Sequence, residues 1–425
     1  MAEILNINYE KFKLDNGLEV VLYEDKTIPI VTVNLWYKVG SANERKGKTG
    51  FAHLFEHMMF QGSKHIPKEK HFKYIQEAGG TLNGSTSFDR TNYYETLPAD
   101  SLELALWLES DRMGFLLDAL TQEKLDNQIG VVSNERRERY DNQPYGRAWE
   151  LLFSNLFPEN HPYHWPTIGW MEDILAFKLD DIKEFFHTYY SPNNASLVIA
   201  GDFDPERAKA LIERYFGEFK PNGNIPEVSV PEFALEKNKT IIHKENVPLP
   251  KIYLAWKSDK LYGKDDAALD IISEVMSGSK NSRLFKSLVF EKQIAQDIGA
   301  FQFSAKYDGV FIIVATAKPD VSLDRIKEEI FSQIEILKNE GPEKKEIEKA
   351  KNVIKSTFIY SLEKLNSLAD IINGYNCNLG EPNSFNYDLN RYYEADDRFI
   401  GQTIKKYFSQ NYVELRIIPK EENDK

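Results

Sequence analysis

The chain has 425 residues, a hydrophobic fraction of 42% and a formal net charge of -13 at pH 7. This length predicts more than one domain, each with its own hydrophobic core. The negative charge argues against nucleic acid or an anionic membrane as the main partner, and leaves basic or neutral polypeptides as candidates. The single cysteine, Cys377, excludes an intramolecular disulfide and a thiolate-rich metal site.

The N-terminal residues contain no basic segment followed by an apolar one, and no later run reaches the length of a membrane-spanning helix. We therefore expect a cytoplasmic protein without a membrane span, or a periplasmic one if a signal peptide was removed from this sequence.

The first half of the chain is predicted to alternate strands with helices. Apolar runs on either side of Asn16-Gly17 predict a β-hairpin over residues 14–23. Further strands are predicted at 30–37, 79–87, 91–97 and 195–200. Helices are predicted at 48–60, 100–120, 122–155, 178–190 and 205–216.

A proline- and glycine-containing segment, residues 221–237, is predicted to be a linker. Beyond it the pattern returns, with strands at 251–256, 311–316 and 413–418 and helices at 264–277, 321–338 and 343–374. Strand 251–256 corresponds to 30–37, helix 264–277 to 48–60, and strand 413–418 to 195–200. We therefore predict two domains of similar topology, residues 1–220 and 238–425, that arose by internal duplication.

The helix predicted near 48–60 contains His53-Leu54-Phe55-Glu56-His57. On a helix that turns about 100° per residue, the two imidazoles and the carboxylate project from one face. Two neutral imidazoles one turn apart can share a zinc ion, and a neighbouring carboxylate can hold a water. The simpler interpretation is two half-buried histidines with an incidental glutamate. Apolar flanks argue against it, because polar groups on a buried helix must be paired or metal-bound.

Zinc with one open position needs a third protein ligand. Glu135 and Glu138 both lie on the helical stretch 122–155 and are the candidates. The residues alone leave the choice open, because each also fits a solvated, charged helix face. The second domain has no equivalent site, since no histidine follows His243.

Several further motifs follow the H-x-x-E-H sequence in a fixed order. They are Gly62-Ser63, Gly79-Gly80 before Asn83, Val131-Val132-Ser133-Asn134-Glu135, residues 161–169, Ser191-Pro192-Asn193-Asn194 and Gly201-Asp202-Phe203. In these motifs the chain resembles the pitrilysin/insulinase-type inverzincin peptidases, which include mitochondrial processing peptidase. The resemblance covers most of residues 12–220 and, more loosely, the second half. It implies an α+β fold of two similar domains, each a mostly antiparallel sheet packed with helices on one side.

The resemblance also implies a zinc metalloendopeptidase with one Zn2+ per chain, held by His53, His57 and Glu135, and it leaves Glu138 out. Zinc would polarise the scissile carbonyl and acidify a bound water. Glu56 would take the proton of that water and pass it to the leaving amine. The implied substrates are peptides or unfolded polypeptide segments.

The flat segment at 79–87 is rich in small polar residues, so another chain could approach its backbone closely. Composition alone favours a plain edge strand equally. The resemblance implies that the segment binds the substrate as an added β-strand, through Asn83, Gly84 and Ser85, with Asn83 near the scissile bond. Relatives often have alanine in place of Gly84, a difference expected to matter little.

The chain departs from the family pattern in two places. Gln128 stands where many relatives have a glutamate that supports the metal ligands, which removes a charge there. Val289 and Gln296 align with an arginine and a tyrosine that help active relatives to hold the substrate. Neither residue can donate hydrogen bonds as that pair does.

Half-length members of the family often work as pairs. We therefore expect a heterodimer in which this chain supplies the zinc and a half-length homologous subunit supplies the Arg/Tyr pair. Two alternatives remain open. One is a non-catalytic scaffold subunit, and the other is a self-sufficient homodimer that uses groups such as Arg283 or Tyr307.

Overall fold

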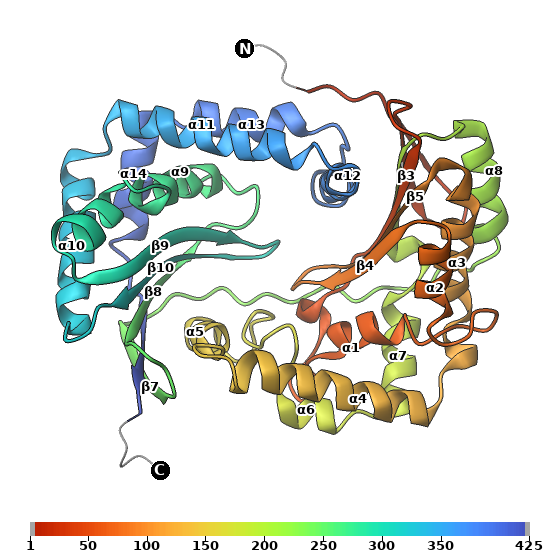
Figure 1. The fold of residues 1–425 in the computed structure, drawn as a ribbon, viewed down its shortest axis with the longest axis horizontal. Helices are drawn as coiled ribbons and strands as arrows, with labels where there is room; N and C mark the ends of the chain where they lie inside the picture. Colours follow the sequence, from red (N-terminus) through yellow and green to blue (C-terminus); the bar gives the residue numbers. More distant parts are fainter. Residues whose placement is uncertain (1–4, 421–425) are drawn as a thin grey trace. The chain divides into compact units, whose positions relative to one another are not determined.

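The computed structural model describes residues 5–420, which form two compact units (Figure 1). The first unit contains the chain up to Arg136 together with Trp165–Ser229 and Ile359–Asn386. The second contains Arg137–His164, Val230–Phe358 and the chain from Tyr387 onward. Each unit thus combines segments from both halves of the chain, unlike the contiguous ranges 1–220 and 238–425, which stay a prediction.

A six-stranded sheet forms the centre of the first unit, in the order β1-β2-β6-β3-β5-β4. Neighbouring strands are antiparallel except β2 and β6, which are parallel. The strands are β1 (Glu10–Lys13), β2 (Glu19–Glu24), β3 (Ile30–Tyr37), β4 (Thr81–Thr86), β5 (Thr91–Pro98) and β6 (Ala195–Gly201). The predicted hairpin around Asn16-Gly17 joins β1 to β2.

A five-stranded sheet forms the centre of the second unit, in the order β7-β11-β8-β10-β9, with β7 and β11 parallel. Its strands are β7 (Lys239–Glu245), β8 (Lys251–Ser258), β9 (Ala295–Ser304), β10 (Gly309–Ala317) and β11 (Val413–Pro419). They take the places of β2, β3, β4, β5 and β6. Two mostly antiparallel sheets of one topology confirm the predicted fold class.

Helices from the first half of the chain pack on one face of the first sheet, and α12 (Leu365–Leu379) packs on the other, so the predicted one-sided packing leaves out α12. The first-half helices of this unit are α1 (Phe51–Met58), α2 (Lys70–Glu77), α3 (Leu102–Phe115), α4 (Gln122–Arg136), α6 (Met171–Leu175), α7 (Leu179–Tyr189) and α8 (Pro205–Phe216). Because strand side chains alternate, Val33 and Leu35 of β3 face the apolar core while Asn34 and Trp36 face α12. Asp370 on α12 accepts hydrogen bonds from both of these side chains.

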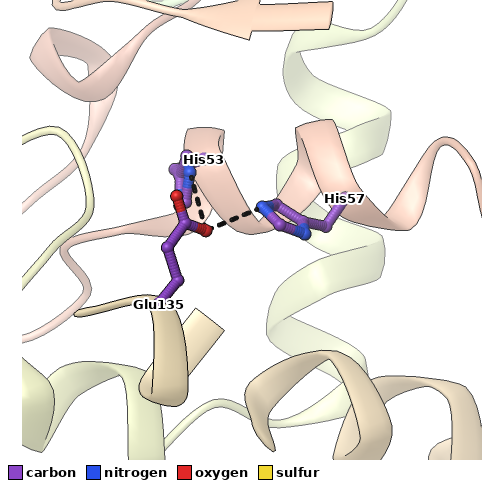
Figure 2. Close-up of side chains that lie close together, drawn as sticks. All are labelled: His53, His57 and Glu135. Carbon is purple, nitrogen blue, oxygen red and sulfur yellow. Dashed lines mark ion pairs between the residues drawn. The ribbon is translucent and has the colours of Figure 1, made fainter. Parts of the chain in front are cut away.

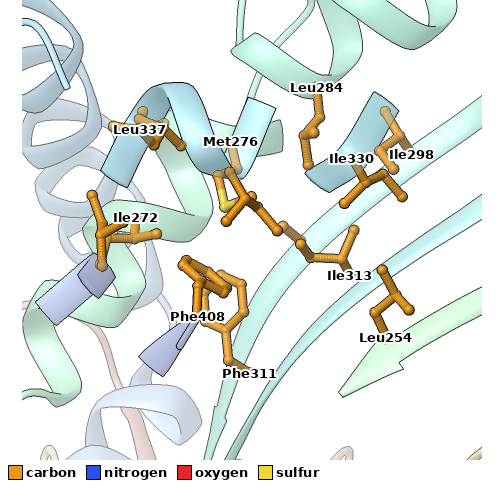
Figure 3. Close-up of a cluster of buried hydrophobic side chains, with 14 of the residues drawn as sticks. Leu254, Ile272, Met276, Leu284, Ile298, Phe311, Ile313, Ile330, Leu337 and Phe408 are labelled. Atoms are coloured by element: carbon orange, nitrogen blue, oxygen red, sulfur yellow. The ribbon is translucent and has the colours of Figure 1, made fainter. Parts of the chain in front are cut away.

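The second unit has a continuous apolar core between its sheet and its helices (Figure 3). The helices are α5 (Ala148–Leu156), α9 (Asp266–Ser277), α10 (Leu323–Glu340), α14 (Asp397–Tyr407) and most of α11 (Lys344–Ser361) and α13 (Phe385–Glu394). Phe311 of β10 packs against Phe408, with ring centroids 5.2 Å apart. The buried Met276 of α9 and Ile330 of α10 belong to the same cluster.

Two helices predicted as continuous are interrupted. The stretch 122–155 breaks after α4 into a π-helical turn, Arg137–Asp141, and a loop before α5. Pro144, which lacks an N–H, and Gly146 stand in that loop and stop the helix. The stretch 343–374 breaks between α11 and α12, where the chain passes from the second unit to the first.

Candidate metal and catalytic site

The helix that carries the H-x-x-E-H sequence begins at a tightly packed backbone crossing. Gly50, at φ 93°, precedes α1 and contacts Gly169, at φ 84°, so closely that a Cβ on Gly169 would lie 2.5 Å from the Gly50 Cα. Only glycine fits both demands without strain. Thr49 donates from its N–H and its hydroxyl to Asp173, at 3.0 and 2.7 Å. Glycine and aspartate therefore fix where α1 starts.

The Glu44 carboxylate closes the first turn of α1. It accepts the N–H groups of Gly50 and Ala52 at 2.9 and 2.8 Å, which otherwise have no partner at a helix start. Burial raises the pKa of Glu44 well above its usual value, while these two donors act to lower it. A carboxylate at this end also suits the helix dipole.

One side of α1 is anchored by aromatic packing. Phe51 stacks on Phe177, with ring centroids 4.2 Å apart, and Phe55 stacks on Tyr190 at 4.9 Å. Phe51 and Phe55 are buried. The opposite side, with His53, Glu56 and His57, is half-buried and remains accessible.

His53, His57 and Glu135 come together, from α1 and α4 (Figure 2). The Glu135 Oε2 atom lies 3.2 Å from His57 Nε2 and 3.7 Å from His53 Nε2. One donor atom from each of the three residues lies within 4.8 Å of the others. Glu138 is exposed, lies in the π-helical turn of the second unit and is not part of this group.

Glu56 is held by the neighbouring strand. Its Oε2 accepts a 2.7 Å hydrogen bond from the Thr86 hydroxyl on β4. Burial raises the pKa of Glu56, and the Thr86 hydrogen bond and the charge of His57 oppose that rise. Thr86 was not singled out from the sequence, although it lies within the predicted substrate segment 79–87, directly after Ser85.

The predicted substrate segment is β4, the edge strand of the first sheet. Asn83, Gly84 and Ser85 pair with Tyr94, Tyr93 and Asn92 of β5. Asn83 is exposed, and its Oδ1 accepts the Gly84 N–H at 2.9 Å.

Gly84 lies directly against Glu56. A Cβ on Gly84 would come 3.2 Å from Glu56 Cγ, so an alanine would require a shift of a few tenths of an ångström. The alanine of relatives therefore does not fit this site unchanged.

The residues that depart from the family pattern lie as follows. Gln128 is buried on α4, and its amide donates to Asn127 Oδ1 at 2.9 Å. Val289 is half-buried against the core of the second unit. Gln296 is exposed on β9, the edge strand of the second sheet. The roles expected for these three residues stay predictions.

Comparison with known proteins identifies the family of this chain. Residues 19–163 match the family described as "Insulinase (Peptidase family M16)", and residues 176–354 match "Peptidase M16 inactive domain". The "Zinc protease PqqE" of Helicobacter pylori is 33% identical over 86% of this chain and 83% of its own length. The chain belongs to peptidase family M16. This confirms the resemblance stated from the motifs.

Other M16 relatives match over nearly their full length. The "Uncharacterized zinc protease YmxG" of Bacillus subtilis is 24% identical over 96% of this chain and 98% of its own. The crystal structure of a protease from Helicobacter pylori superposes with a TM-score of 0.90 and 30% identity, covering 97% of this chain and all of that one.

In residues 5–420, no helix is long and apolar enough to cross a membrane.

Proposed function

We propose that this M16 chain is a zinc endopeptidase that hydrolyses peptides or unfolded polypeptide segments, with Glu56 as the general base. The observation that carries the proposal is the convergence of two imidazoles and one carboxylate beside Glu56. Tetrahedral zinc binds nitrogen and oxygen donors at about 2.0–2.1 Å, which places the donors roughly 3.3 Å apart. The distances of 3.2 and 3.7 Å from Glu135 Oε2 to His57 and His53 Nε2 suit that geometry.

His53, His57 and Glu135 would therefore hold the metal, leaving one position open. When bound, zinc would supply a Lewis acid that polarises the scissile carbonyl and makes water acidic. Three protein ligands of this kind are typical of catalytic rather than structural zinc. The relatives named as zinc proteases support the same assignment.

The contacts of Glu56 indicate which of its atoms moves the proton. Thr86 donates to Oε2, while Oε1 accepts no hydrogen bond from any residue in the described range 5–420. Oε1 is then the atom that takes a proton from water and returns it to the leaving amine. Burial raises the pKa of Glu56, which makes the carboxylate a stronger base for the uptake of this proton.

The free edge of β4 would bind the substrate backbone. The Ser87 N–H donates to the Arg90 carbonyl at 2.9 Å and closes the β4–β5 turn. Counting back along the antiparallel register, Asn83 and Ser85 turn their backbone groups toward β5, so Leu82, Gly84 and Thr86 turn theirs outward. The Gly84 N–H, which now donates to Asn83 Oδ1, would then donate to a backbone carbonyl of the substrate strand.

Zinc binding is tested by comparing two glutamates of the same stretch. Glu135→Gln should lower zinc affinity by at least about 100-fold, because it removes a charged ligand rather than a group behind one. Glu138→Gln should leave zinc affinity unchanged. The measurement is metal content by mass spectrometry after reconstitution of both variants against a competing chelator. Equal zinc retention by the two variants would rule out Glu135 as the ligand.

We also propose a half-length homologous partner that supplies an Arg/Tyr pair. Val289 and Gln296 support this, since an apolar and an amide side chain occupy the aligned positions. Adding a partner that carries both residues should raise peptide hydrolysis at least about tenfold, the scale of one lost charged hydrogen bond. Full activity of the isolated chain would favour the self-sufficient homodimer. Zinc-free, inactive protein with and without the partner would favour the scaffold subunit.

A further inference from the structure

Arg90 lies on the face of the predicted substrate strand that carries the Ser85 side chain. It stands in the turn between β4 and β5, and its Nη1 donates to the Ser85 carbonyl at 3.0 Å and to Asn92 Oδ1 at 3.1 Å. Nη1 also contacts the Ser85 hydroxyl. The guanidinium carbon is 5.2 Å from the centre of the Trp36 ring. One edge of the guanidinium is thus held by both β4 and β5.

The positive charge of Arg90 has no direct counter-charge. Within residues 5–420, no carboxylate oxygen lies within 4.0 Å of its guanidinium nitrogens. The nearby Asp370 is engaged elsewhere, since its Oδ1 accepts from Asn34, Trp36 and Asn92 at 3.2, 2.8 and 2.8 Å. Burial lowers the pKa of Arg90, while the negative charges of Asp370 and Glu56 act to raise it from a longer distance. A partly buried cation without a partner is costly, so an anion beside it would be stabilising.

The other edge of the Arg90 guanidinium is available. Its Nε and Nη2 atoms donate to no residue of the described range 5–420, and neither is among the polar atoms shut off from solvent. These two N–H groups point the same way and form the fork that pairs with a carboxylate through two parallel hydrogen bonds. A lysine could not reproduce this geometry.

We propose that Arg90 is a specificity-determining residue that binds a carboxylate of the peptide added at β4. The proposal rests on the proposed function, because it takes β4 as the peptide-binding edge. Side chains of an added strand alternate between the faces, so every second residue would lie on the face of Ser85 and Arg90. The carboxylate is either an acidic side chain at one of these positions or the C-terminus of a short peptide.

Peptide binding can be measured separately from hydrolysis. Short fluorescein-labelled peptides carry a single glutamate or a single glutamine at the same position, each with a free or an amidated C-terminus. They are titrated by fluorescence anisotropy against zinc-loaded Glu56→Gln protein, which should not cleave them. The glutamate peptide should bind about 10- to 100-fold more tightly than the glutamine peptide, as expected for a charged two-point hydrogen bond. Preference for the free C-terminus alone would assign the carboxylate to the peptide end.

Arg90→Gln in the same background should abolish this preference, and Arg90→Lys should keep only part of it. Arg214→Gln, which makes the same charge change on the exposed surface of α8, should leave the preference intact. Thermal unfolding of each variant checks that it is folded.

Loss of affinity for all peptides alike in Arg90→Gln would overturn the proposal, since Arg90 would then only hold the hairpin. Absence of any preference for the carboxylate in protein that keeps Arg90 would overturn the proposal too. A preference in binding without hydrolysis by the wild-type chain, both alone and with an Arg/Tyr-bearing partner, would instead overturn the proposed function and leave the role of Arg90 standing.

Discussion

Replacing Glu56 by glutamine should remove nearly all peptide hydrolysis while the protein keeps its zinc. Glutamine has nearly the same shape and can still accept the Thr86 hydrogen bond, but it cannot take a proton from water at neutral pH. General acid–base catalysis contributes about 10²- to 10⁴-fold to rates, and kcat should fall by that factor. KM should change little, because Glu56 would not hold the substrate backbone. The measurement is kcat and KM on an unfolded polypeptide, in the most active assembly.

The variant Thr86→Val serves as the matched control. It removes the hydroxyl that holds Glu56 Oε2 but leaves the carboxylate in place, so we expect a smaller loss of kcat than in Glu56→Gln. Zinc content should equal that of the wild-type chain in both variants. Wild-type turnover by Glu56→Gln would remove Glu56 from the mechanism, and loss of zinc would make the activity result uninformative about the base.

The regular elements of this fold could be predicted where one local pattern dominated. Residues 30–37 alternate between apolar and polar positions and form β3 with those bounds, and helix 205–216 is α8. The edge strand β9 was not predicted, because polar residues and Gly299 interrupt its apolar residues. The helix α2 was not predicted, because it is short and mostly polar, and the form of both elements depends on their neighbours. No proline or glycine marks the break between α11 and α12 in the sequence. The break lies close to the point where the chain passes from the second unit to the first, which no local pattern indicates.

The residues of the candidate site could likewise be predicted only where a local pattern places them. His53, Glu56 and His57 lie within two turns of one helix, so helical periodicity alone brings them to one face. The choice between Glu135 and Glu138 depends on how α4 packs on α1 and where it ends. Neither is a local property of the sequence, so the choice came from the family resemblance. Arg90 and Thr86 carry no spacing signal, and only their contacts across the β4–β5 hairpin identify them.

A second polar cluster, buried in the first unit, has a structural role. Arg112 on α3 is fully buried and donates from Nε to Glu109 at 2.9 Å and from Nη2 to Glu95 of β5 at 3.3 Å. Its guanidinium carbon lies 4.1 Å from the centre of the Tyr93 ring. Burial, reinforced by the charge of Glu109, raises the pKa of Glu95 well above its usual value. His71, Glu95 and Glu109 lie close enough together to share a cation, and Arg112 supplies that charge itself.

Arg112→Met should therefore lower the free energy of unfolding by about 3–5 kcal/mol, the cost of leaving a buried charge without its partner. Methionine fills much of the space but leaves Glu109 without its donors. Glu95→Gln should cost far less, because glutamine resembles the protonated acid that burial favours at this position. The double variant Arg112→Met/Glu109→Gln should recover part of the loss, since it removes the stranded charge. Urea unfolding, followed by tryptophan fluorescence, compares the midpoints. If Arg112→Met were as stable as the double variant, Glu109 would have found another partner. The cluster would then not anchor α3 to β5.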